Sequence, residues 1–391
     1  MMNKKLLIIA ILITAFLALS VNTAFSKPFS LLQAEAKENA KAFGRNRAPQ
    51  ASRPEEPKDD LSFEEYSEEN IYKETKVSPN DGQAYDKFGG SVSLSGDYAL
   101  VGAFADDDNG PNSGSVYAFK RNKDEWELEE KLLVDDGDAY DNFGSSVSLS
   151  GNYAIVGAKG DSENGPFAGA AYILKKSENG WIKAQKLLAE EGVPYGSFGI
   201  SASISDDHAI VGAFISGHAY IFKNGKNGWE QSALLTADNS NFDEFGHSVS
   251  ISGDYAIVGA AGDDLFGTSS GAAYIFERNE NGDWEERQKI TASDSMPNLY
   301  FGTTVFIAGD SAVVGATSIN SSTPGAAYVF ERSQDGWVEV KKLLASDGES
   351  GDVFGDTVSI TNDYVIVGAR QDNDNGTHSG SAYFYEEIRQ R

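Results

Sequence analysis

Aspartates recur at fixed positions along this chain, and their carboxylates are its clearest candidates for chemistry. In four segments, one aspartate stands seven residues and another two residues before a Phe-Gly pair. These pairs are Asp81/Asp86, Asp136/Asp141, Asp238/Asp243 and Asp347/Asp352. A second set follows Val-Gly-Ala segments and includes Asp106, Asp108, Asp372 and Asp374. Because calcium takes about six to eight oxygen ligands, these carboxylates with nearby backbone carbonyls predict divalent-cation binding, with calcium as the cofactor.

The same aspartates also have a structural interpretation. Aspartate ends strands, forms Asx turns and keeps an exported surface soluble. Neither residues 106–110 nor residues 372–376 have the spacing of an EF-hand loop, because the glycine falls one place early. Both interpretations of the aspartates therefore stay open.

Catalytic motifs are scarce in this sequence. The histidines fall at unrelated positions: His208, His218, His247 and His378. The sequence contains no G-x-S-x-G elbow, no H-E-x-x-H pair and no glycine-rich phosphate loop. A glycosidase needs only a pair of carboxylates, but these carboxylates recur along the chain, whereas an active site should break a repeat. The pattern favours binding over catalysis.

A repeated unit positions the aspartates. Phe-Gly pairs recur at spacings of 55, 55, 47, 56 and 53 residues and begin at Phe88, Phe143, Phe198, Phe245, Phe301 and Phe354. Each pair opens an alternating strand, a two-residue turn such as Gly96-Asp97, an apolar strand like YAIVGA and a strand like GAAYIF. A fourth strand opens with a tryptophan that we expect to pack against its neighbours: Trp126, Trp181, Trp229, Trp284 and Trp337.

Four antiparallel strands in each of six units predict an all-β, six-bladed β-propeller over residues 71–391. The chain begins with a lone fourth strand, about Ile71 to Ser78, and ends with three strands, about Phe354 to Glu386. We therefore expect the N-terminal strand to complete the last blade and close the ring. In this register the loops after the second and fourth strands share one face. We call these loops the acidic loop face.

The units resemble FG-GAP repeats, the blades of the integrin α-subunit propeller and of related bacterial exported proteins. The resemblance covers about residues 71–387 and rests on the Phe-Gly pairs, the Val-Gly-Ala segments and the Gly-x-x-Tyr-type strands. It implies a propeller whose upper-face loops bind extracellular ligands. Integrin propellers have one blade more than the six counted here. Their calcium loops lie between the first and second strands, where this chain has a two-residue turn, so that type of calcium site does not carry over.

Residues 1–26 have the features of an export signal. Lys4 and Lys5 precede an apolar run over residues 6–21, and Ala24 and Ser26 favour cleavage before Lys27. An uncleaved signal anchor is the alternative, because the run is slightly short for a spanning helix. Residues 27–70 are polar and contain prolines, which predicts a disordered linker. We expect the protein to be secreted, periplasmic or at the cell surface.

The charge of the chain limits its partners. The 391 residues carry 32 Lys+Arg against 59 Asp+Glu, a net charge of −27, and no cysteine. Residues 1–60 hold nine basic and six acidic residues, so the remaining 23 basic and 53 acidic residues give the rest of the chain −30. Such acidity argues against nucleic acid and against an anionic membrane surface as partners. Membrane contact would come only through an uncleaved anchor. Without cysteine, disulfide frameworks and thiolate metal sites are excluded.

We expect a binding module that recognises an extracellular protein or polysaccharide through the acidic loop face, in an adhesion-like role that calcium assists. Aromatic residues anchor binding interfaces, and these loops contain Tyr85, Tyr140, Tyr195, Phe214, Phe242 and Tyr300. The third unit has a short loop at residues 214–217 and no aspartate pair, so it either admits a ligand or reflects drift of one repeat. The alternatives are a polysaccharide lyase or hydrolase on the same scaffold, and a structural surface protein without a specific ligand.

Overall fold

The computed structural model describes residues 76–123, 125–237, 243–318, 323–361, 364–374 and 379–386. The predicted signal and linker, residues 1–70, lie outside the described residues, as do Asp238, Phe242 and His378. Within the described ranges, no helix is long and apolar enough to cross a membrane.

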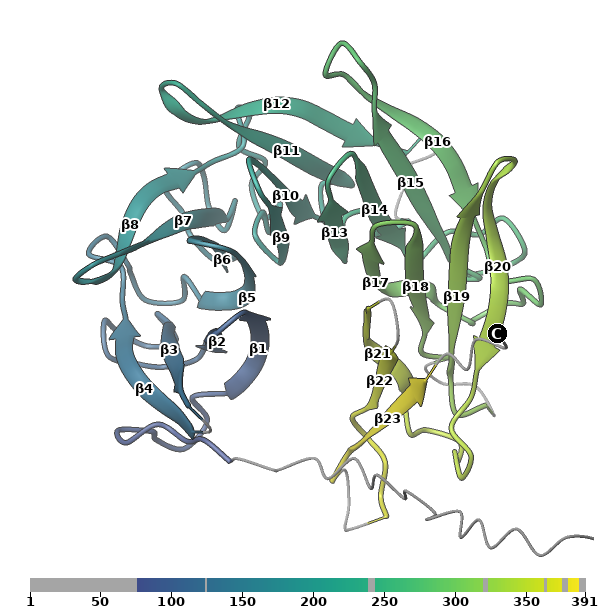
Figure 1. Ribbon diagram of the computed structural model, residues 1–391, viewed down its shortest axis with the longest axis horizontal. Helices are drawn as coiled ribbons and strands as arrows, with labels where there is room; N and C mark the ends of the chain where they lie inside the picture. Colours follow the sequence, from purple (N-terminus) through teal and green to yellow (C-terminus); the bar gives the residue numbers. More distant parts are fainter. Residues whose placement is uncertain are drawn as a thin grey trace, which may run out of the picture. The chain divides into compact units, whose positions relative to one another are not determined.

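Six antiparallel sheets follow one another along the chain and surround a common axis (Figure 1). We number them as blades 1 to 6. Blade 1 contains β1–β4 (Phe88–Ser95, Tyr98–Ala103, Ser115–Asn122, Glu125–Leu132), blade 2 contains β5–β8 (Phe143–Ser150, Tyr153–Ala158, Ala170–Ser177, Gly180–Leu187) and blade 3 contains β9–β12 (Ser201–Ser205, His208–Ala213, His218–Gly225, Gly228–Thr236). Blade 4 contains β13–β16 (Val249–Ser252, Tyr255–Ala260, Ala272–Arg278, Trp284–Ile290), blade 5 contains β17–β20 (Phe301–Ala308, Ser311–Ala316, Ala326–Ser333, Gly336–Leu343) and blade 6 contains β21–β23 (Phe354–Ile360, Tyr364–Ala369, Ser381–Glu386).

This arrangement confirms the predicted six-bladed propeller. Five blades have four strands in sequential order, and blade 6 has three among the described residues. The first strand of each blade lies nearest the axis and the fourth lies outermost (Figure 1). Residues 76–78, the described part of the predicted closing strand, are not in a strand, and residues 71–75 lie outside the described ranges.

The short turns after the first strands follow from their glycines. Gly151 has a φ of 56° and lies between paired residues Ser150 and Tyr153. A positive φ at the first central position matches the right-handed twist of the flanking strands. In blade 3, Asp206 occupies this place with a φ of 52°. Aspartate tolerates that conformation better than most residues, so the hairpin survives the substitution.

The Phe-Gly pairs of blades 2 to 6 lock each blade against the one before it, whereas Gly89 of blade 1 meets no atom within 4 Å. The Phe143 ring is fully buried and meets the Tyr172 ring edge-on at 5.4 Å. A Cβ on Gly144 would lie 2.5 Å from the backbone oxygen of Ser115 in blade 1. No side chain larger than a hydrogen fits such an approach. The dipeptide therefore combines a large buried ring with a close contact between two backbones.

The tryptophans fix the outer strands. Trp181 is buried, and its ring lies edge-on to Tyr98 of blade 1 at 6.0 Å. Its backbone N–H donates to Oε1 of Glu130 at 2.5 Å. In the same way, the backbone N–H of Trp229 donates to Oε1 of Gln185 at 2.8 Å. The two hydrogen bonds join a blade to the outer strand of its predecessor, and the Trp181 ring contacts the second strand of blade 1.

Candidate functional site

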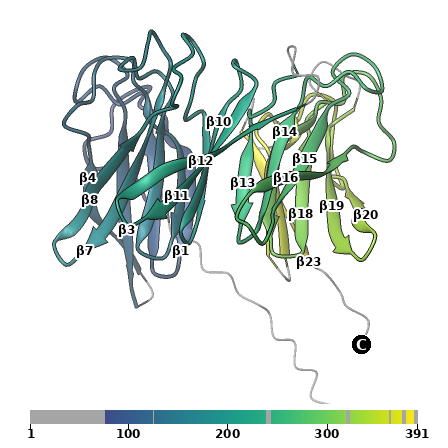
Figure 2. The same cartoon turned by 90° about the horizontal axis from the view of Figure 1, so that it is seen from above.

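The loops of the acidic loop face emerge at one end of the propeller. The strands of each blade run side by side from one end of the ring to the other, as the side view shows (Figure 2). Because neighbouring strands are antiparallel, the loops after the second and fourth strands share an end. This topology places those of the predicted aspartates and aromatic residues that the structure describes on one face.

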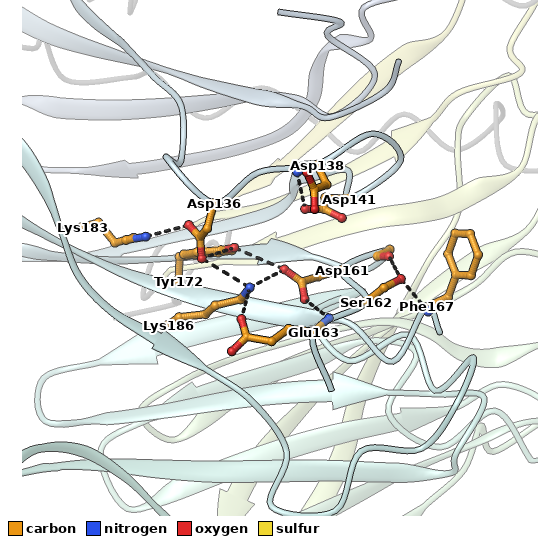
Figure 3. Close-up of polar contacts among 11 residues, drawn as sticks. Asp136, Asp138, Asp141, Asp161, Ser162, Glu163, Phe167, Tyr172, Lys183 and Lys186 are labelled. Atoms are coloured by element: carbon orange, nitrogen blue, oxygen red, sulfur yellow. Dashed lines mark hydrogen bonds and ion pairs between the residues drawn. The ribbon is translucent and has the colours of Figure 1, made fainter. Parts of the chain in front are cut away.

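In blade 2, a lysine lies among three carboxylates, one of which, Asp136, is a predicted metal ligand (Figure 3). Nζ of Lys186 lies 2.6 Å from Oδ2 of Asp161, 2.7 Å from Oε2 of Glu163 and 3.4 Å from Oδ2 of Asp136. The hydroxyl of Tyr172 is within 3.3 Å of Asp161 and 3.4 Å of Asp136, and donates to these carboxylates. We call this arrangement a Tyr-Lys-Asp cluster.

The cluster recurs in blade 1. Nζ of Lys131 lies 2.8 Å from Asp81, 2.8 Å from Asp106 and 2.7 Å from Asp108, and the hydroxyl of Tyr117 donates to Asp81 at 2.9 Å. Burial alone would lower the pKa of Lys131, but the hydrogen-bonded carboxylates raise it overall. The ammonium group is thus held charged at the centre of three acids.

Blades 4 and 5 contain smaller versions of the cluster. Lys289 pairs with Asp263, and Lys342 lies 2.6 Å from Asp294. The hydroxyl of Tyr328 donates to Asp294 at 2.8 Å. In each of these blades the tyrosine comes from the third strand, the lysine from the fourth strand and the carboxylate from a loop.

Blades 3 and 6 depart from this pattern in opposite ways. Blade 3 has Leu234 at the lysine position, paired with Tyr220. In blade 6, the hydroxyl of Tyr383 donates at 3.0 Å to both Asp347 and Asp372, and strands β21–β23 contain no lysine. The neighbouring Asp372 is the main cause that raises the pKa of Asp374.

These contacts bear on the expectation of calcium. Lysine ammonium groups occupy the centres of the clusters in blades 1 and 2. Among the residues that the structure describes, no group of three or more acidic or histidine side chains is arranged to hold a metal ion. The sequence reasoning overlooked the lysines, although Lys131, Lys186, Lys289 and Lys342 each stand 12 residues before a Phe-Gly pair. Calcium binding stays a prediction without structural support.

The second aspartate of each pair serves its own loop. Oδ2 of Asp141 accepts from the backbone N–H of Asp138 at 2.8 Å, and its backbone oxygen accepts from Gly160 at 3.0 Å. Asp86 and Asp352 accept equivalent bonds from Gln83 at 2.5 Å and Glu349 at 2.6 Å. Burial raises the pKa of Asp141 to about 6, and the nearby Asp161 and Asp138 add to the shift. Burial, with Asp263 nearby, also raises the pKa of Asp243.

Four of the predicted aromatic residues share a strained backbone conformation. Tyr85, Tyr140 and Tyr195 stand three residues before a Phe-Gly pair, and Tyr300 stands directly before one; their φ values are 78°, 73°, 63° and 55°. Their side chains are 84%, 53% and 59% exposed in the first three cases and half-buried in the fourth. Blade 6 has Gly351 three residues before its Phe-Gly pair, with a φ of 96°. We call the four residues the tyrosine ring.

Tyr195 has a partner that the sequence reasoning missed. Its ring stacks on Phe167 at 5.9 Å with an interplanar angle of 16°. Phe167 also has a positive φ, of 49°, and is 45% exposed. Phe214, the second predicted platform in this sector, instead packs edge-on against His247 at 5.3 Å. Phe167 lies on the loop that carries Asp161 of the blade 2 cluster, whereas Tyr195 lies on the loop that leads to blade 3, which lacks a Tyr-Lys-Asp cluster.

Solved structures with a similar fold share little sequence with this chain. A putative 6-phosphogluconolactonase from Bacteroides uniformis is 11% identical, with a TM-score of 0.50, over 76% of this chain and 88% of that one. A protein from Lactobacillus plantarum is 13% identical, with a TM-score of 0.49, over 73% and 78% of the two chains. No curated protein matches the sequence.

The repeat itself identifies the family. The FG-GAP repeat matches six segments of the chain: residues 72–119, 126–174, 181–227, 229–276, 284–330 and 337–385. The second to sixth matches begin at the tryptophan of an outer strand, and all of the matches except the third end within the third strand of a blade. This chain belongs to the FG-GAP repeat family.

Proposed function

We propose that this chain is an exported binding module that recognises an extracellular protein or polysaccharide through the acidic loop face, in an adhesion-like role. The observation that carries the proposal is the tyrosine ring. Tyr85, Tyr140 and Tyr195 are exposed and yet have a positive φ. Export rests on the signal features of residues 1–26.

The strain in the tyrosine ring calls for a function. A side chain with a Cβ in the left-handed region costs about 1–2 kcal/mol relative to the ordinary conformation. Glycine removes this cost, as Gly351 does at the same position of blade 6. Exposed rings contribute little to the packing of the fold. Strained residues that persist on a surface are typical of functional sites, and tyrosine is among the side chains that dominate binding energy.

Tyrosine-to-glycine variants test the proposal. Tyr195→Gly in the full chain should raise the free energy of unfolding and weaken binding to glycan arrays or to host-surface proteins. Ile182→Ala serves as the control. It shortens an exposed side chain on β8, outside the tyrosine ring, and should leave binding unchanged. If Tyr195→Gly is destabilised, or binds as well as the parent chain, the tyrosine ring is not a binding surface.

We also propose that the N-terminal segment closes the ring. Lys76 stands 12 residues before Phe88, the spacing that Lys131 and Lys186 keep from their own Phe-Gly pairs. Blade 6 is the blade whose cluster has Tyr383 and two aspartates but no lysine on its strands. The first FG-GAP match begins at residue 72, at the phase of the outer-strand tryptophans. A fourth strand containing Lys76 would supply the missing cation.

The exposed edge of blade 1 supports this closure. Val92 and Leu94 on β1 are 68% and 66% exposed, whereas their counterparts Val147 and Leu149 on β5 are each 8% exposed. In blade 2 these positions face blade 1. In a closed ring, blade 6 would cover the corresponding side chains of blade 1. Burial of this apolar surface would stabilise the closed form.

A further inference from the structure

Two positions of the repeat differ from blade to blade, although their neighbours stay nearly constant. The first follows Phe-Gly and the second follows Val-Gly-Ala. The first position holds Gly90, Ser145, Ile200, His247, Thr303 and Asp356, and the second holds Phe104, Lys159, Phe214, Ala261, Thr317 and Arg370. Both lie at the loop end of the two strands nearest the axis (Figure 1). In blades 1, 2, 5 and 6, the first position lies in a bulge, a feature that re-aims side chains.

Contacts among these residues run from blade to blade around the axis. Nζ of Lys159 in blade 2 lies 5.4 Å from the ring centre of Phe104 in blade 1. Nδ1 of His247 in blade 4 donates to the backbone oxygen of Thr303 in blade 5 at 3.2 Å. In blade 6, Nε of Arg370 lies 3.3 Å from Oδ2 of Asp356. Burial raises the pKa of Asp356, and the nearby Arg370 and His247 oppose that shift.

Lys159 differs from every other basic side chain in the described ranges. It is half-buried, and no carboxylate forms an ion pair with it among the described residues. The other half-buried lysines and arginines there, such as Lys186 and Arg278, have acidic partners. Burial lowers the pKa of Lys159. A desolvated charge without a partner is unfavourable, and the Phe104 ring compensates only part of that loss.

We infer that Lys159 and Phe104 bind a carboxylate-bearing sugar, such as a hexuronate residue, at the loop end of the axis. A hexuronate carries an apolar C–H face and a single carboxylate on one ring, which matches an aromatic side chain beside one unpaired ammonium group. An acidic peptide side chain lacks that apolar face. A phosphate group carries more charge than one lysine neutralises, and it also lacks an apolar C–H face. The inference rests on the proposed function and deepens it, because Phe104 and Lys159 begin loops of the acidic loop face; neither residue belongs to the tyrosine ring, so the Lys159 and Tyr195 variants test the two separately.

Calorimetric titration of the full chain with an oligogalacturonate tests the inference. We expect saturable binding that Lys159→Gln weakens by about tenfold or more, the loss typical of one unpaired charge. Lys175→Gln is the matched control, because Lys175 also lies over an aromatic ring, Tyr153 at 5.5 Å, but is exposed. It should leave binding unchanged. The neutral galactose oligosaccharide should bind more weakly than the acidic one.

Thermal unfolding gives a readout that needs no ligand. Lys159→Met keeps the contact with Phe104 but removes the desolvated charge, so its melting temperature should equal or exceed that of the parent chain. A lower melting temperature would mean that Lys159 has a structural partner and would overturn the assignment. Absence of oligogalacturonate binding, equal binding of the neutral sugar, equal weakening by Lys175→Gln, or binding of a glutamate-rich peptide in place of the sugar would overturn it as well.

Discussion

Replacement of Lys186 by alanine tests whether the Tyr-Lys-Asp clusters hold the acidic loop face together. In the folded chain, the Lys186 side chain is 14% exposed and that of its partner Asp161 is 3% exposed. The substitution leaves the Asp161 carboxylate buried beside Asp136 and Glu163 without a cation. The hydroxyl of Tyr172 remains as its donor.

The expected loss follows from this burial. Breaking a buried ion pair by removing one partner costs about 3–5 kcal/mol. Glu163 and Asp136 are 58% and 38% exposed, so solvent screens their share, and we expect Lys186→Ala to lose about 2–4 kcal/mol. Lys183→Ala is the control, because among the described carboxylates Lys183 forms an ion pair with Asp136 alone and is 36% exposed, and it should lose about 0–1 kcal/mol.

Urea unfolding of the full chain, followed by tryptophan fluorescence, measures both losses from the shift in midpoint at unchanged slope. Adding Asp161→Asn to Lys186→Ala removes the unpaired charge and should recover at least half of the stability. Equal losses in Lys186→Ala and Lys183→Ala, or no recovery in the double variant, would refute the reasoning. Such a result would mean that the lysine does not stabilise the buried aspartates.

Three further predictions concern the ring, the loops and the Phe-Gly contact. If the ring is closed, Leu94→Asp buries a carboxylate and should destabilise the chain by about 2–4 kcal/mol. Ile182→Asp, at a site that is 50% exposed, should cost little. Equal small losses in the two variants would argue for an open ring. The pKa of Asp141 is raised from 3.8 to about 6, so the folded state holds its proton more tightly than the unfolded state. The contribution of Asp141 to the free energy of unfolding is therefore favourable at low pH and is lost as the pH rises from about 4 to 6. Over that range the urea midpoint of Asp141→Asn should fall less than that of the parent chain. Parallel curves of midpoint against pH would contradict this. Gly144→Ala should lower the free energy of unfolding, measured in urea, by several kcal/mol, because its Cβ would lie 2.5 Å from a backbone oxygen. Gly282→Ala has a similarly positive φ but meets no atom within 4 Å, so it should lose only the backbone strain of about 1–2 kcal/mol; similar losses would contradict the proposed lock.

The fold could be predicted because its signals are local and repeated. The Phe-Gly pair, the turn at Gly151 and the outer tryptophans each mark one step of the blade, and six copies in phase leave little choice of architecture. The closing strand is different, because its described part, residues 76–78, shows no strand pairing.

The candidate site could be predicted only in part, because its contacts depend on pairing between distant strands. Lys131 is 50 residues from Asp81 in the chain. The pairing of its strand, β4, with β3 also shifts register at a bulge between Ala118 and Phe119. Residue types alone therefore suggested metal ligands where the structure shows ion pairs. The positive φ of Tyr85 was equally hidden, because tyrosine rarely adopts it.

The separation between constant and variable positions in each blade has an evolutionary consequence. Phe143 and Gly144 fit only one way between two blades, whereas Ser145, the next residue, lies in a bulge and contacts the next blade through a single hydrogen bond to the backbone oxygen of Gly199. A mutation at the second kind of position changes the chemistry at the axis without disturbing the ring. Duplication of one blade copies the Phe-Gly contact between blades and adds a new residue near the axis that can diverge. A family built in this way can acquire new specificities by single substitutions, one blade at a time.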